Sequence, residues 1–375
     1  MNILLVHHLI RVSESQVTFT AVDYYRMQKP MQVLNRLDPE INYATIDSLK
    51  VEDSFLQRFD LVLFSRTMPR EAPERLNKLG IPFGLDLDDY WNLPDDHILA
   101  PSYKTNKTPE LIIDSIKAAH FVTCTTEILA SYIKEFNENV YVVENGIDTD
   151  DDIWQPNKSK SDRVRFGFTQ GSTHIPDVAL VSKDVAKSLY DNKFYHKGQV
   201  VLCGFSARHQ EESVYIGYER MLTDDLKPLK FYPKYCHELK ILHNPLGLDM
   251  PYRRIWTRDV DEFGSVYDDI DIAVAPLKES TFNSCKSNIK MLEAGFKDCA
   301  VMVSDISPYT PLATKENSFL LNEKSFFEWQ RYILLNPSII EDKKAQLKED
   351  VKWFELKNLT KKRKEVYESC IGVLK

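Results

Sequence analysis

Short apolar runs alternate with longer amphipathic stretches along the first half of the chain. The apolar runs predict strands at residues 2–7, 42–46, 61–64, 83–87, 121–124 and 140–144. The stretches between them, such as residues 21–37 and 109–119, repeat apolar positions every three or four residues and predict helices, although Pro30 should interrupt the first. Strands that alternate with helices indicate an α/β fold with parallel sheets.

The same alternation begins again after a polar stretch. Turn residues and acidic side chains dominate residues 145–162, which predicts a linker. Further strands are predicted at residues 164–168, 199–205, 239–243, 271–275 and 300–304, and a helical tail follows residue 340. We therefore expect an N-terminal Rossmann-like domain (1–150), a linker (151–162), a C-terminal Rossmann-like domain (163–340) and a tail (341–375). Two such domains predict a cleft between them, because nucleotides bind at the carboxyl ends of parallel strands.

Composition narrows the class of protein. The 375 residues are 43% hydrophobic and 28% charged, which is typical of a globular protein, and no apolar run is long enough to cross a bilayer. The first apolar run is short and has no basic residues before it, so we expect no signal peptide and a cytoplasmic protein. Six scattered cysteines indicate reduced thiols and no zinc module, and we expect no bound metal or cofactor.

The distribution of charge bears on partners. A net charge of −8 disfavours a general nucleic-acid-binding protein, because neutralisation of phosphates dominates such affinity. A basic run at residues 361–364 lies in the predicted tail. It predicts either a solvated helix face or a peripheral contact with an anionic membrane surface, such as the inner face of the cell membrane.

Residues 276–295, with the sequence PLKESTFNSCKSNIKMLEAG, form the strongest candidate binding segment. They lead from a predicted buried strand through a polar loop into an amphipathic helix. Lys286, Ser287 and Asn288 open that helix, where free backbone N–H groups and the positive end of the helix dipole favour an anion. Glu293 follows deeper in the helix, one turn after Lys290. The arrangement predicts a cradle for a nucleoside diphosphate.

Two other loops carry polar side chains at predicted strand ends. Gly171, Ser172 and Thr173 follow the first strand of the second series, either as ligand contacts or as an ordinary strand-to-helix turn. An acidic cluster of Asp86, Asp88 and Asp89 follows a strand of the first half, where carboxylates hold an acceptor hydroxyl, organise a loop, cap a turn or bind a metal.

Two arginines are further candidates. Arg26 and Arg66 can contact an anion or form structural ion pairs. The chain contains no Ser-His-Asp, Cys-His or P-loop pattern.

Residues 276–295 resemble the donor-binding segment of retaining glycosyltransferases with the GT-B fold, the group 1 or family 4 enzymes. Residues 123–130 and 142–148 resemble the end of the N-terminal domain of that fold. The resemblance implies a final helix that crosses back to the first domain and catalysis without a metal. It also implies that Glu293 holds the ribose of the nucleotide. A second glutamate, eight positions earlier, contacts the sugar in that family, but here the position is Cys285.

The resemblance implies transfer of a sugar from a nucleotide-diphosphate sugar to a hydroxyl acceptor, with retention of configuration. The acceptor implied is a surface glycan or a lipid-linked oligosaccharide. The residues assigned to the donor are Gly171, Ser172, Thr173, Asn283, Lys286, Ser287, Asn288 and Glu293; those assigned to catalysis are Asp88 and Glu279, and those on the acceptor side are Arg26, Asp86 and Asp89.

Three alternatives stay open. A phage-type glycosyltransferase would act on modified bases of DNA, and a sugar-nucleotide epimerase would use the same fold for another reaction. A non-catalytic module that binds nucleotide-sugars is the third alternative, and the cysteine at position 285 keeps it open.

Overall fold

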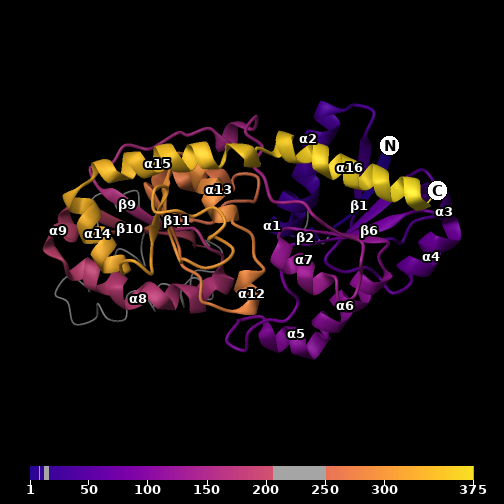
Figure 1. Cartoon of the computed structure of the whole chain (residues 1–375), viewed down its shortest axis with the longest axis horizontal. Coiled ribbons are helices and arrows are strands. Elements are labelled where there is room, and N and C mark those ends of the chain that lie inside the picture. Colours follow the sequence, from indigo (N-terminus) through magenta and orange to yellow (C-terminus); the bar gives the residue numbers. More distant parts are fainter. Residues whose placement is uncertain (8, 12–16, 206–250, 375) are drawn as a thin grey trace.

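The computed structural model describes residues 1–7, 9–11, 17–205 and 251–374, and it contains two six-stranded sheets side by side (Figure 1). We call residues 1–146 the first half and residues 157–350 the second half. The strand predicted at residues 239–243 lies outside the described residues.

The first sheet contains the six predicted strands of the first half, and every pair of neighbours is parallel. Its order is β4 (Asn42–Ile46), β1 (Asn2–Val6), β5 (Leu61–Ser65), β6 (Phe83–Leu87), β7 (Phe121–Cys124) and β8 (Val140–Val142). In register, Leu4 of β1 lies between Ala44 and Val62. Central strands of this kind are buried on both faces, which explains their nearly continuous apolar sequences.

The second sheet is also parallel throughout. Its order is β11 (Tyr252–Trp256), β10 (Gly198–Phe205), β9 (Val164–Phe168), β12 (Ile272–Ala275), β13 (Ala300–Val303) and β14 (Ser318–Leu320). The sequence did not predict the two outer strands. Two arginines interrupt the apolar run of β11, and β14 has only three residues.

Helices cover both sheets (Figure 1). In the first half they are α1 (Ala21–Asp23), α2 (Lys29–Leu37), α3 (Asp53–Leu56), α4 (Ala72–Leu79), α5 (Ala100–Asn106), α6 (Thr108–Ala118) and α7 (Glu127–Ile133), and a short hairpin joins β2 (Leu9–Arg11) to β3 (Val17–Phe19). In the second half they are α8 (Ile175–Tyr190), α9 (Asn192–Lys197), α12 (Thr281–Ser284), α13 (Ile289–Phe296), α14 (Phe326–Leu335) and α15 (Ser338–Asp350). Single turns occur at η2 (Asp152–Trp154), η3 (Ser172–His174) and η7 (Lys352–Phe354), a longer 3-10 helix occurs at η6 (Phe263–Asp269), and α16 (Leu356–Leu374) is the last helix.

The first long helix is interrupted, as Pro30 predicts. A π-helical turn, η1 (Tyr24–Gln28), separates α1 from α2, and Pro30 lies in the first turn of α2. A proline is tolerated there because the first N–H groups of a helix have no partner within the helix. The π-helical turn carries Tyr25 and Arg26, two side chains of the site described below.

The tail crosses back to the first half. Helix α15 lies on the second half, η7 breaks the helix, and α16 packs against α2 (Figure 1). This confirms the helix that the resemblance implied, although the predicted tail is not one continuous helix.

The basic run at residues 361–364 lies within α16 and is largely paired. Arg363 is buried and donates to the hydroxyl of Tyr367, while Lys362 and Lys364 form ion pairs with Glu144 and Asp38 of the first half. Two of these lysines therefore link the tail to the first half. No helix among the described residues is long and apolar enough to span a bilayer.

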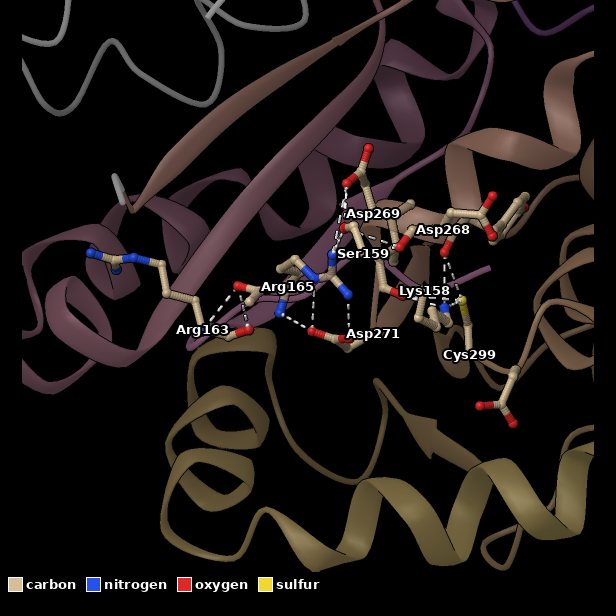
Figure 2. Close-up of polar contacts among 12 residues, drawn as sticks. Lys158, Ser159, Arg163, Arg165, Asp268, Asp269, Asp271 and Cys299 are labelled. Atoms are coloured by element: carbon tan, nitrogen blue, oxygen red, sulfur yellow. Dashed lines mark hydrogen bonds and ion pairs between the residues drawn. The ribbon is translucent and has the colours of Figure 1, made fainter. Parts of the chain in front are cut away.

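Part of the predicted linker is attached to the second half (Figure 2). The ammonium group of Lys158 donates to the backbone oxygens of Tyr267 and Ile270, and the hydroxyl of Ser159 donates to Asp269 at 2.6 Å. Beside them, the guanidinium group of Arg165 forms an ion pair with Asp271 at 2.8 Å. Ile153 and Gln155 are fixed to the second half as well, because the ammonium group of Lys297 donates to both of their backbone oxygens.

The chain passes between the halves at two points that lie side by side. Ile147 pairs with Glu355 as an isolated parallel bridge, and its N–H donates to the backbone oxygen of Phe354 at 3.0 Å. Gly146 is tightly enclosed at this point, because a Cβ atom there would lie 2.8 Å from that same oxygen. The two crossings therefore form one joint.

Candidate functional site

A cavity lies where the order of the second sheet changes direction. Strands β9 and β12 are neighbours there. From β9 the strand order continues toward one edge of the sheet and from β12 toward the other edge. The loops that follow, 169–174 and 276–288, border a void of about 940 Å³ that opens to solvent and that we call the central cavity. It is lined by Ala21, Val22, Tyr25, Arg26, Asp88, Asp89, Asn145, Gln170, Thr173, His174, Leu277, Lys286, Ser287, Ile289, Lys290, Glu293 and Tyr309. Both halves contribute to this lining.

Glu293 is the most heavily engaged carboxylate of the central cavity. Its side chain is 1% exposed and accepts hydrogen bonds from the hydroxyls of Tyr25 (3.0 Å) and Tyr267 (2.6 Å). Lys290, one turn earlier in α13, donates to the same carboxylate at 2.8 Å. Burial and the adjacent carboxylate hold the pKa of both tyrosines well above the ordinary value, so both phenols stay protonated as donors. Tyr25 reaches this group from the opposite half.

Lys286 lies at the entrance to α13. Its ammonium group is 3.1 Å from a carboxylate oxygen of Asp89 and 4.4 Å from the centre of the Phe282 ring. The side chain of Asn288, at the N-cap, makes no capping hydrogen bond to α13, so no side chain occupies the helix start from that position. The geometry leaves an N-terminal turn and a nearby cation beside the central cavity.

The three acidic residues of the first half have different surroundings. Asp86 is buried in β6 and forms a two-point ion pair with Arg26, which also donates to the backbone oxygen of Val143 and to Asn145. Such a closed network is structural, because each guanidinium group inside the protein needs several acceptors. Asp86 therefore lies behind the central cavity rather than in it.

Asp88 and Asp89 lie just beyond the end of β6 and line the central cavity. One carboxylate oxygen of Asp88 is buried and has no hydrogen-bond partner among the described residues. Burial and the neighbouring Asp89 raise the pKa of Asp88 to about 7. Burial also opposes ionisation of Asp89, but Lys286 and Arg66 hold the pKa of Asp89 below its ordinary value. One carboxylate is therefore half-protonated near neutral pH while its neighbour is ionised.

The structure places the predicted residues in two groups. Those that line the central cavity are Arg26, Asp88, Asp89, Thr173, Lys286, Ser287 and Glu293; those outside its lining are Asp86, Gly171, Glu279, Asn283 and Asn288, and the side chain of Ser172 lies outside the part of the chain that the structure describes. Glu279 is exposed and borders another hollow, together with Ser304 and Asp305. Asn283 is buried, and its amide donates to Asp177 and to the backbone oxygen of Lys278.

Cys285 lies between the two halves. Its side chain is fully buried, belongs to the apolar core of the first half and is not part of the lining of the central cavity. Its backbone oxygen accepts a hydrogen bond from Thr126 at 3.1 Å. Burial raises the pKa of the thiol to about 12. At this position the chain has a packing contact between halves in place of a carboxylate that faces a ligand.

Several polar side chains that line the central cavity, or that contact its lining as Tyr267 does, were not predicted from the sequence. Tyr267 belongs to η6, which carries no recognisable motif, and Gln170 and Tyr309 are single polar residues in loops. Asn145 donates to the hydroxyl of Ser287 at 2.8 Å across the halves. The one feature of the sequence that could have indicated this role is that Asn145 directly follows the last predicted strand of the first half. Among the described residues, no three His, Cys, Asp or Glu side chains come together in an arrangement that holds a metal ion.

Comparison with known proteins identifies the fold. No family model matches the chain, and no curated protein matches it in sequence. Solved structures do match over nearly its whole length. A glycosyltransferase from Rickettsia africae superposes with a TM-score of 0.59 at 13% identity, covering 99% of this chain and 98% of that one.

Two further structures were solved with ligands. Anabaena HepE in complex with UDP and glucose superposes with a TM-score of 0.62 at 9% identity and covers 98% of this chain and 99% of its own. TarM from S. aureus, solved with UDP and other ligands, gives a TM-score of 0.53 at 13% identity over 94% of this chain and 60% of its own. The chain therefore has the GT-B fold, with two parallel-sheet halves facing a cleft and a final helix that returns to the first half.

Proposed function

We propose that this protein is a glycosyltransferase that moves a sugar from a nucleoside-diphosphate sugar to a hydroxyl group of an acceptor. The observation that carries the proposal is the buried carboxylate of Glu293. It lies in α13, beyond the N-terminal turn of that helix, and lines a cavity to which both halves contribute. Because HepE was solved with UDP and with UDP-glucose, UDP is the first nucleotide to test as the nucleotide part of the donor.

The diphosphate would bind at the entrance to α13. Lys286 and Lys290 both line the central cavity, and each already contacts a carboxylate. Phosphate oxygens would take over the contact that Asp89 makes with Lys286, and the first N–H groups of α13 would add hydrogen bonds. These charges would stabilise the departing diphosphate, so we expect transfer to need no metal ion.

The ribose would bind at Glu293. A buried carboxylate accepts hydrogen bonds from two vicinal hydroxyls, and Tyr25 at present fills one of its two oxygens. Tyr267 and Lys290 hold the other oxygen and fix the orientation of the group. The exchange of a phenol for a ribose hydroxyl would link donor binding to the position of the first half.

Chemistry would take place between this donor and the acidic residues of the first half. The bond from the anomeric carbon to the diphosphate oxygen breaks, its electron pair leaves with the diphosphate, and the acceptor oxygen forms the new bond as its proton passes to a neighbouring base. Asp88, whose unpartnered carboxylate oxygen belongs to the lining of the central cavity, would face the acceptor. Closure of the halves excludes water and so limits loss of the donor by hydrolysis.

Retention of configuration, the assignment of Glu279 to catalysis, and an acceptor that is a glycan or a lipid-linked oligosaccharide are the parts of the proposal that rest on the resemblance.

The first test measures nucleotide binding. Calorimetry with UDP, GDP and ADP should give a clear affinity for one of them, and Glu293→Gln should weaken it by about 10- to 100-fold, because a charged hydrogen-bond acceptor is worth about 1.5–3 kcal/mol. Lys286→Ala should weaken diphosphate affinity by a similar factor. Lys104→Ala, which removes an exposed ion pair with Asp95, is the matched control and should bind normally.

A panel of nucleotide-sugars then tests for turnover. Mass spectrometry should detect release of the free nucleoside diphosphate in the presence of EDTA. Binding without any release would favour the non-catalytic module, and absence of both binding and release would refute the proposal.

A further inference from the structure

A second hollow, which we call the side pocket, adjoins the central cavity. Its empty space, including the part that is open to solvent, is about 400 Å³. It is lined by Pro94, Asp96 and His97 from the first half and by Thr173, His174, Pro176, Asp177, Lys278, Ser280, Phe282 and Asn283 from the second half. Thr173 and His174 line both hollows, so they mark the border between them.

A histidine–aspartate pair occupies this border. Nδ1 of His174 is 2.7 Å from a carboxylate oxygen of Asp177. The other oxygen of Asp177 accepts from the backbone N–H of Lys278 and from the amide of Asn283, each at 2.8 Å. Asp177 is 5% exposed, so these contacts fix its orientation. This explains why Asn283 points away from the central cavity.

The pair leaves one imidazole nitrogen available. An ionised carboxylate only accepts hydrogen bonds, so Nδ1 of His174 carries the proton and Nε2 is left as an acceptor in the neutral ring. The ring lies at the start of α8, where the positive end of the helix dipole disfavours an imidazolium ion. Burial and Lys286 lower the pKa of His174 further, against the opposing effect of Asp177. Asp89, another neighbouring charge, also opposes this shift.

We infer that the side pocket binds the acceptor as a sugar and that His174 accepts the proton of its attacking hydroxyl. The inference rests on the proposed glycosyl transfer. As the acceptor oxygen bonds to the anomeric carbon, the O–H proton moves to Nε2 of His174 and the electron pair of the broken bond leaves with the diphosphate. Asp177 holds the ring in the required tautomer and stabilises the imidazolium that forms. This balance holds whichever face of the donor sugar the hydroxyl attacks.

The lining of the side pocket suits a saccharide. Two prolines and the buried ring of Phe282 offer apolar surfaces for C–H groups, while Asp96 and Lys278 offer hydrogen bonds to hydroxyls. Asp96 and Lys278 form an ion pair at 2.7 Å between the halves. An acceptor in the side pocket would therefore contact both halves.

The test uses the nucleoside-diphosphate sugar that the wild-type protein hydrolyses, with water as acceptor and then with methyl α-glucoside added. His174→Gln and Asp177→Asn should slow release of the nucleoside diphosphate by 10²- to 10⁴-fold, the range for loss of a general base, while UDP affinity stays within about threefold of wild type. His120→Gln is the matched control, since His120 is a partly buried histidine whose ring contacts Asn77 and Phe83, and it should change neither quantity.

Two further measurements keep the inference testable if a variant is unstable. The wild-type rate should fall as pH is lowered through the depressed pKa of His174, and that acidic limb should be absent in His174→Gln. Pro94→Trp, which fills the side pocket away from the central cavity, should abolish any stimulation of nucleoside diphosphate release by sugar acceptors.

The outcomes separate the two proposals. Unchanged turnover in His174→Gln would overturn the inference, and so would a loss of UDP affinity that matches the loss of rate, because His174 would then be a donor ligand. A wild-type protein that neither binds nor hydrolyses any nucleotide-sugar would instead refute the proposed function, and the inference with it.

Discussion

The two halves share one architecture but contribute different chemistry to the central cavity. The second half supplies Lys286, Lys290 and the carboxylate of Glu293, which suit a nucleoside diphosphate. The first half supplies the carboxyl groups of Asp88 and Asp89 and the hydroxyl of Tyr25, which donates a hydrogen bond. The difference follows from topology, because both sheets present their carboxyl ends to the cleft while the loops that follow these ends differ.

Contacts between the halves use the groups that a ligand would need. Lys286 meets Asp89, Tyr25 meets Glu293, and Asn145 meets Ser287. Each is a side-chain contact that a phosphate or a hydroxyl can replace. The two halves therefore meet across the central cavity through exchangeable polar contacts, in addition to the apolar contact of Cys285, whereas each half is held internally by an apolar core.

The first prediction distinguishes Asp86, which we regard as structural, from Asp88 and Asp89, which line the central cavity. Arg26→Ala should lower the free energy of unfolding by about 3–5 kcal/mol, because it leaves Asp86 as a buried charge without its partner. Urea denaturation followed by circular dichroism measures this loss. Lys104→Ala, at an exposed ion pair, should leave stability unchanged. A small effect of Arg26→Ala would mean that the network with Asp86 is not structural.

The second prediction concerns Asp88. Its pKa is about 7 in the folded protein and 3.8 as the reference value, so the folded state holds a proton that the unfolded chain loses between these values. Stability should therefore fall as pH rises through this window, and Asp88→Asn should remove that fall. We expect Asp88→Asn to gain on the order of 2 kcal/mol relative to wild type between pH 5 and pH 8, measured by thermal unfolding at both values. An equal effect of the substitution at both pH values would contradict it.

The third and smallest prediction concerns the contact across the cavity. Tyr25→Phe removes the hydroxyl that occupies one oxygen of Glu293, so the ribose would no longer compete with it. A single hydrogen bond is worth about 0.5–1.5 kcal/mol net, which predicts UDP binding tighter by about 2- to 10-fold. Calorimetry with UDP tests this, and Tyr103→Phe, which removes a hydroxyl bonded to Arg66, is the matched control. Weaker binding in Tyr25→Phe would show that the hydroxyl contacts the donor itself.

The interior strands and the candidate anion segment could be predicted because both depend on local pattern. Parallel strands buried on both faces produce continuous apolar runs, and the anion site predicted at the entrance to α13 depends on the free N–H groups of a local helix start. The two outer strands of the second sheet escaped prediction, because edge positions tolerate polar residues such as Arg253 and very short runs.

Which polar side chains face the central cavity depended on rotations that sequence spacing does not encode. Asp86, Asp88 and Asp89 are nearly adjacent, yet β6 ends between the first and the second of them, so one lies in the sheet and two lie in the cavity. Asn283 and Lys286 are three residues apart, but the short helix α12 directs the first to Asp177 and the second to Asp89.

The sequence by itself determined that this protein has two parallel α/β halves and that residues 286–293 lead into a helix whose first N–H groups we predict to bind phosphate. The tertiary structure decided that Tyr25, 268 residues away, contacts Glu293, that Cys285 packs between the halves, and that His174 stands between two hollows. The physical reason is that strand and helix patterns arise from neighbours along the chain. A site between two halves arises from how two separately folded surfaces meet.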